Sequence, residues 1–183
     1  YMIIKPLKKN SEFVAFVSDI NLKKKLNKSE IGIIQKKIDR FGVLVFRNQS
    51  LTDDEQVKFS EYFGNIERSG KKSNITKDSD RRLSTKLADV SNIDKKSIVF
   101  KKNDPRRIFN LGNRLWHSDS SFKKIPAKYS LLSSKTIVKK GGNTEFSDMR
   151  LAYENLKDDI RNKIETLYCE HSLIYSRQRL GFD

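Results

Sequence analysis

The sequence predicts an α+β fold, in which helices accompany a β-sandwich or barrel. Three observations predict it. Apolar residues recur at helical spacing between residues 29 and 63, short β-rich runs follow from residue 108, and one amphipathic stretch interrupts those runs at 147–167. A chain of 183 residues is long enough to bury one core, so we expect one domain over residues 1–183.

The N-terminal elements are predicted by local patterns. The run Phe-Val-Ala-Phe-Val at 13–17 has the length and composition of a short buried strand. Apolar side chains at helical spacing predict a helix over 29–41, which Gly42 should end. The continuous apolar run at 43–46 predicts a strand at the centre of a sheet.

A capping box opens the next predicted helix. The Thr52 hydroxyl can accept from a backbone N–H while the Glu55 carboxylate reaches back, and the helix should run to Phe63 before Gly64. The polar, basic segment 67–107 that follows fits either a long loop or a lid that contacts substrate.

The second half of the chain should be mainly strands. Three are expected, over Leu115–Ser121, Tyr129–Val138 and Thr144–Phe146. The pair Gly141-Gly142 supplies a tight turn. Ser147 should cap the helical stretch, and Leu167–Ile174 should return to strand.

The chain is strongly basic, with 38 Lys and Arg against 23 Asp and Glu and a net charge of +15. Such charge suits nucleic-acid binding, but the basic residues come as short runs without interleaved aromatics, so we favour a solvated lysine-rich surface. A single cysteine excludes a disulfide framework and a cysteine-based metal site and agrees with a cytoplasmic location. No apolar run is long enough to span a bilayer, so we expect no membrane partner.

One short motif carries candidate metal chemistry. The sequence Leu115-Trp116-His117-Ser118-Asp119 holds one of only two histidines in the chain. In a strand, side chains two residues apart point to the same face, so His117 and Asp119 should project together. An imidazole and a carboxylate are two of the three ligands in the facial triad of non-haem iron oxygenases. An ordinary ion pair would have the same spacing.

The surrounding segments resemble the TauD/TfdA family of Fe(II)- and 2-oxoglutarate-dependent dioxygenases. The resemblance rests on residues 113–122, 126–133 and 141–150, with support from 41–47 and Phe63-Gly64. Leu-Trp-His-Ser-Asp-Ser-Ser-Phe and Thr-Glu-Phe-x-Asp-Met-Arg resemble the aryloxyacetate branch more than the taurine branch.

The resemblance implies a double-stranded β-helix, a jelly-roll that encloses the metal. It implies Fe(II) on His117 and Asp119 and 2-oxoglutarate held by the Thr144 hydroxyl in Gly-Gly-x-Thr. Asn113, four residues before the histidine, matches a substrate-contacting position of the taurine branch. Trp116 would pack in the core behind the metal strand.

The family's second histidine ligand and its 2-oxoglutarate-binding arginine lie further along the chain, and we expect their positions beyond Asp183. His171, with Arg177 and Arg179 nearby, could substitute for them. The segment around His171 instead resembles a family segment without a ligand, so we interpret His171 as structural. The 183 residues are then an N-terminal and central part of the domain, without the distal strands.

The expected function is hydroxylation of a small organic acid anion, aryloxyacetate-like or sulfonate-like, with O2 as co-substrate and release of succinate and CO2. Lys71 and Lys72, in the basic segment, are the first candidates for binding the anion. Two alternatives stay open: a basic nucleic-acid-binding domain, and an inactive part of an oxygenase. The sequence leaves the oligomeric state open, a homo-oligomer included.

Overall fold

The computed structural model describes residues 2–67 and 75–182. The chain forms two compact units, one made of residues 1–64 and 132–168 and the other of residues 65–131 and 169–183. Among the helices of the described residues, none combines the length and the apolar character that crossing a membrane requires.

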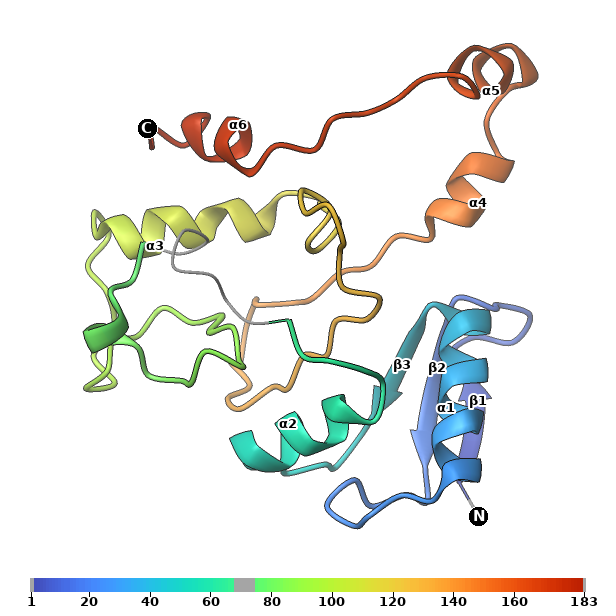
Figure 1. Cartoon of the computed structure of the whole chain (residues 1–183), viewed down its shortest axis with the longest axis horizontal. Helices are drawn as coiled ribbons and strands as arrows, with labels where there is room; N and C mark the ends of the chain where they lie inside the picture. Colours follow the sequence, from blue (N-terminus) through green and yellow to red (C-terminus); the bar gives the residue numbers. More distant parts are fainter. Residues whose placement is uncertain (1, 68–74, 183) are drawn as a thin grey trace. The chain divides into compact units, whose positions relative to one another are not determined.

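A three-stranded sheet lies in the first unit (Figure 1). It consists of β1 (Ile3–Pro6), β2 (Val14–Ser18) and β3 (Val43–Phe46), in the order β1-β2-β3. The strands predicted at 13–17 and 43–46 are confirmed. The central position predicted for 43–46 is wrong, because β2 pairs antiparallel with β1 and parallel with β3. The sequence reasoning missed β1, whose run Ile-Ile-Lys-Pro is too short to show alternation.

The helix predicted at 29–41 is confirmed as α1 (Lys28–Phe41), which connects the parallel strands β2 and β3. Asn27 begins it with a capping box, since its side chain accepts from Glu30 N at 2.9 Å and Glu30 Oε2 accepts from Asn27 N at 2.8 Å. Gly42 ends it at φ 72°, a conformation that favours glycine.

The Thr52 capping box is also confirmed. Glu55 N donates to Thr52 Oγ1 at 3.2 Å, Thr52 N donates to Glu55 Oε2 at 2.8 Å, and α2 (Asp53–Glu61) follows. The helix ends two residues before Phe63, because the amide of Phe63 bonds three residues back, to Ser60.

The core of the first unit joins the sheet to α1 and α2. Its buried apolar residues are Ala15, Val17, Leu22, Leu26, Ile34, Phe41, Val57 and Phe59. The Phe59 ring meets the rings of Phe46 and Phe63 edge to face, with centroids 5.8 and 5.2 Å apart.

Replacing Phe59 by alanine is expected to lower the free energy of unfolding by about 3–5 kcal/mol, because a buried ring leaves a cavity. Urea unfolding followed by circular dichroism measures the change. Phe146→Ala is the matched control: the same ring in the same unit is 55% exposed, so its loss should cost less than about 1 kcal/mol. Equal midpoints for the two variants would contradict the placement of the core.

Residues 132–168 complete the first unit with two short helices, α4 (Met149–Glu154) and α5 (Asp158–Ile164), in place of one continuous helical stretch. The cap predicted at Ser147 is wrong: Asp148 caps α4, since its Oδ1 accepts from Arg150 N at 3.0 Å. The predicted strands at 129–138 and 144–146 have irregular backbone instead.

The second unit contains η1 (Asp78–Asp80), α3 (Pro105–Asn110), η2 (Leu111–Arg114) and α6 (Leu173–Gln178). The strand predicted at 115–121 is irregular, and the one at 167–174 gives way to α6, which Ser172 caps. A strand needs a hydrogen-bonded neighbour, and in the described part of the chain none lies alongside these segments. The sheet of the described residues therefore comes from the N-terminal third.

Candidate metal centre

His117 and Asp119 lie directly after η2, on irregular backbone. The prediction that a strand presents them is therefore wrong. Their side chains nevertheless converge, with His117 Nε2 3.2 Å from Asp119 Oδ1. The convergence predicted from the sequence is confirmed, although a local turn at Asp119-Ser120, where Ser120 has φ 57°, replaces strand alternation.

A contact at the other ring nitrogen of His117 determines the tautomer of its imidazole. Nδ1 lies 2.7 Å from the carbonyl oxygen of Leu115. A carbonyl oxygen only accepts, so Nδ1 carries the hydrogen and a neutral ring presents the Nε2 lone pair to Asp119. Metal-binding histidines use this arrangement, in which a backbone carbonyl orients the ring.

The distance between the two groups suits a shared metal ion. Two atoms that bind a first-row divalent ion at about 2.1 Å and at right angles lie about 3.0 Å apart. The observed 3.2 Å is close to this value. Two lone pairs facing each other are unfavourable unless a cation or a proton lies between them. A protonated His117 would make an ion pair, and with side chains 45% and 59% exposed such a pair stabilises by about 1 kcal/mol at most.

A polar cluster holds the chain just after the pair. Glu67 Oε1 accepts from Ser120 Oγ at 2.9 Å and lies 2.6 Å from Lys123 Nζ. Glu67 thus ties the turn after Asp119 to the start of the second unit. Sequence reasoning missed Glu67, because 53 residues separate it from Ser120 and no short-range pattern connects them.

Trp116 and His171 are both exposed. Trp116 is 70% exposed, so the prediction that it packs in the core is wrong, because without a strand no buried face forms behind the motif. His171 follows the irregular segment after α5. Residues 2–67 and 75–182 bring together no group of three His, Cys, Asp or Glu side chains that could hold a metal ion.

Thr144 lies in the first unit, on exposed irregular backbone. Gly141 and Gly142 adopt the left-handed conformation that favours glycine, with φ of 76° and 70°, but the backbone there is irregular and the tight turn predicted for this pair is not formed. The approach of Thr144 to His117 stays a prediction. Two cations anchor its segment: Lys135 Nζ donates to Leu51 O at 2.7 Å, and Arg150 Nη1 donates to Arg40 O, at the C-terminus of α1, at 2.9 Å.

The candidate substrate-binding residues are only partly placed. Asn113 lies in η2 and is exposed, four residues before His117. Lys71 and Lys72 lie outside the described residues, so their role stays a prediction.

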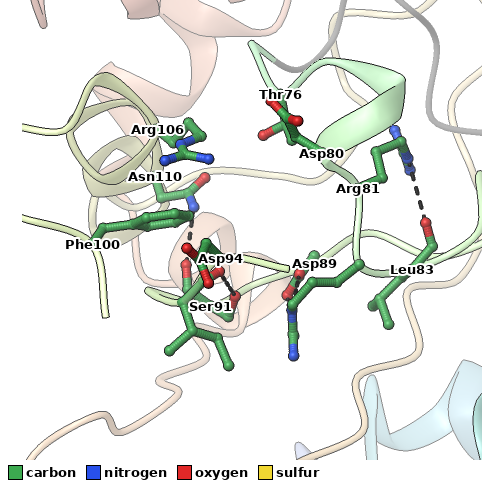
Figure 2. A pocket seen from close by; sticks show the side chains of 12 residues that line it. Thr76, Asp80, Arg81, Leu83, Asp89, Ser91, Asp94, Phe100, Arg106 and Asn110 are labelled. Carbon is green, nitrogen blue, oxygen red and sulfur yellow. Dashed lines mark hydrogen bonds and ion pairs between the residues drawn. The ribbon is translucent and has the colours of Figure 1, made fainter. Parts of the chain in front are cut away.

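The basic segment 75–107 forms a polar pocket together with α3 (Figure 2). Arg106 and Asn110 reach it from α3, and the Arg106 guanidinium lies 4.2 Å from the centre of the Phe100 ring. Arg82 binds Asp89 through two hydrogen bonds of 2.8 and 2.9 Å. Burial acts to raise the pKa of Asp89, but the hydrogen bonds from Arg82 and Ser91 bring it below its ordinary value.

Internal ion pairs organise this pocket. Arg106 also binds Asp104, and its hydrogen bond lowers the pKa of that carboxyl group. Arg81 donates to the backbone carbonyl of Leu83. The described part of this segment, residues 75–107, is thus mostly irregular backbone with polar contacts of its own, and its role as a lid that contacts substrate stays a prediction.

Comparison with known proteins identifies the family. The model of the family described as "Taurine catabolism dioxygenase TauD, TfdA family" matches residues 4–182. The chain belongs to the TauD/TfdA family. The resemblance found in the sequence is thereby confirmed.

Three similar proteins show how much of the chain the similarity covers. The alpha-ketoglutarate-dependent 2,4-dichlorophenoxyacetate dioxygenase of Cupriavidus pinatubonensis is 39% identical over 92% of this chain and 58% of its own length. The (S)-phenoxypropionate/alpha-ketoglutarate-dioxygenase of Sphingobium herbicidovorans is 34% identical over 77% of this chain and 44% of its own length. The crystal structure of AAD-2 in complex with Mn(II) and N-oxalylglycine is 46% identical, with a TM-score of 0.90 over 99% of this chain and 62% of that one.

The chain thus spans less than two thirds of the length of these relatives. The AAD-2 structure is of a complex with Mn(II) and N-oxalylglycine.

Proposed function

We propose that the chain provides the iron-binding and 2-oxoglutarate-binding part of a dioxygenase that hydroxylates a small organic anion of the aryloxyalkanoate type. The complete domain would be a double-stranded β-helix, to which later strands contribute. The single observation that carries the proposal is the His117–Asp119 pair, whose Nε2 and Oδ1 face each other at 3.2 Å while Nδ1 is held by a carbonyl.

His117 and Asp119 would hold Fe(II), which with 2-oxoglutarate and O2 supplies oxidising power for hydroxylation and releases succinate and CO2. The contribution of the protein is to orient the groups around that reaction. Leu115 holds the imidazole in the tautomer that leaves Nε2 available. Thr144 would donate its hydroxyl hydrogen to a 2-oxoglutarate carboxylate, and Asn113 would contact the substrate.

Two observations support the proposed substrate class: the positive charge of one segment and the names of two similar proteins. The segment 68–107 holds thirteen Lys or Arg and five Asp or Glu, which suits an anionic substrate, and Lys71 and Lys72 would bind its carboxylate. Two relatives carry names of dioxygenases acting on phenoxy acids. Hydroxylation of the carbon next to the ether oxygen gives a hemiacetal, which collapses to a phenol and a 2-oxo acid.

The experiment supplies the natural protein that contains these residues with Fe(II), ascorbate and 2-oxoglutarate. One arm receives an aryloxyacetate and another an alkyl sulfonate. We expect succinate and free phenol in equal amounts with the aryloxyacetate. Thr144→Val, which keeps the shape and removes the hydroxyl, should raise the KM for 2-oxoglutarate about tenfold, because one hydrogen bond to a charged group is lost.

The outcomes separate the parts of the proposal. Succinate with the sulfonate alone would move the substrate to that class. No succinate with either substrate, or a Thr144→Val variant with an unchanged KM, would contradict the reaction or the role of Thr144. Ser134→Ala, on the same segment, is the matched control for loss of a hydroxyl.

A further inference from the structure

We propose that Arg177 is a positioning residue for the metal centre, acting through Gly112. Its guanidinium occupies a notch left by the missing side chain at Gly112, and so fixes the segment that carries His117. The inference rests on the proposed function, because it assigns Arg177 a role at the proposed iron site. The residues involved all belong to the second unit.

The guanidinium is held against α3 by two contacts. Arg177 Nη1 donates to the carbonyl oxygen of Phe109 at 3.1 Å, and its Cζ lies 4.3 Å from the centre of the Phe109 ring. The Nε atom is buried and has no hydrogen-bond partner among the described residues. Partial burial lowers the pKa of Arg177, and the hydrogen bond to Phe109 and the contact with its ring offset part of the cost of removing the cation from water.

Gly112 makes room for this side chain. A Cβ atom at position 112 would come within 1.5 Å of Arg177 Nη1 and 2.8 Å of its Cζ. Both atoms belong to the end of a flexible side chain, so an added Cβ would require the guanidinium to move. An alanine there would push the guanidinium away from both the Phe109 carbonyl and the Phe109 ring.

The same glycine connects to the metal pair on its other side. Gly112 O accepts from Leu115 N at 3.2 Å, and Leu115 O in turn meets His117 Nδ1 at 2.7 Å. A continuous set of contacts therefore runs from Arg177 through Gly112 and Leu115 to the imidazole. Displacing Arg177 frees η2 to shift, and with it the carbonyl that orients His117.

The segment that follows α6 makes a separate contact with α3, so a role of Arg177 in folding can be distinguished from a role at the metal centre. Phe182 meets Phe109 edge to face, with centroids 5.5 Å apart. Arg179, at the end of α6, is exposed and offers a matched control of equal charge.

The test measures Mn(II) affinity of the natural protein by the electron paramagnetic resonance signal of free Mn(II), with thermal unfolding recorded in parallel. We expect Arg177→Met and Gly112→Ala each to weaken Mn(II) binding about tenfold, the lower end of the range for residues that orient metal ligands. Arg177→Lys, which keeps the stem and charge, should fall between wild type and Arg177→Met. Arg179→Met should bind as wild type does.

The double variant Gly112→Ala with Arg177→Ala is decisive. Removing the guanidinium frees the space that the new methyl group needs, so the double variant should bind Mn(II) no more weakly than either single change. Additive losses, or wild-type affinity in Arg177→Met and Gly112→Ala, would overturn the inference. A fall in melting temperature with unchanged Mn(II) affinity would assign Arg177 to folding alone, which also overturns it. If His117→Ala binds Mn(II) as wild type does, the proposed function fails instead.

Discussion

Replacing His117 by alanine is expected to abolish Mn(II) binding and to lower succinate formation in the natural protein more than about a hundredfold. Losing a residue that only orients a metal ligand costs about ten- to hundredfold, and losing the ligand itself should cost more. With Nδ1 bound to the Leu115 carbonyl, a neutral imidazole offers its Nε2 lone pair to a metal, and the described residues contain no cluster of three ligand-type side chains. Asp119→Asn should act in the same direction, since it keeps the shape of the carboxylate and removes its charge.

The matched control for this change is the other histidine of the chain. His171→Ala also removes an exposed imidazole, and we expect it to leave Mn(II) affinity and turnover near the wild-type values. Titration with Mn(II) and measurement of succinate decide between two interpretations of the His117–Asp119 pair. An ordinary ion pair predicts that His117→Ala leaves both quantities unchanged, whereas a loss in both histidine variants would make His171 a ligand.

Local patterns predicted the N-terminal third of the chain well, for a physical reason. Capping boxes and apolar periodicity act within one or two helical turns, so Thr52 and Glu55 could be recognised from their spacing alone. The βαβ connection through α1 also needs only neighbouring segments, β2 and β3.

The second half was predicted less well because strands depend on distant partners. The alternation at 115–121 and the β-rich composition at 129–138 indicate segments that suit a strand. A strand forms only where another strand supplies hydrogen bonds, and a local pattern does not show whether one does. The candidate site shows the same division. His117 and Asp119 were found from their spacing, whereas Glu67 and Arg177 act across 53 and 68 residues and leave no local pattern.

Several large apolar side chains in the second half of the described chain are exposed to solvent. In the first unit, Leu132, Ile137, Phe146 and Leu167 are each more than half exposed. Such side chains are normally buried, so they mark a surface that another segment would cover.

The last prediction concerns the 183-residue chain by itself, which we expect to form no more succinate than its own His117→Ala variant. Two ligands hold Fe(II) weakly and the facial triad needs three, yet the described residues contain no cluster of three ligand-type side chains. A buried 2-oxoglutarate carboxylate also needs a cation, and Arg177 is already engaged by Phe109. The measurement supplies Fe(II), ascorbate and 2-oxoglutarate to the chain and to a longer natural form, and we expect turnover in the longer form only. Turnover by the chain above its His117→Ala control would show that these residues complete the site, and would make His171 the third ligand.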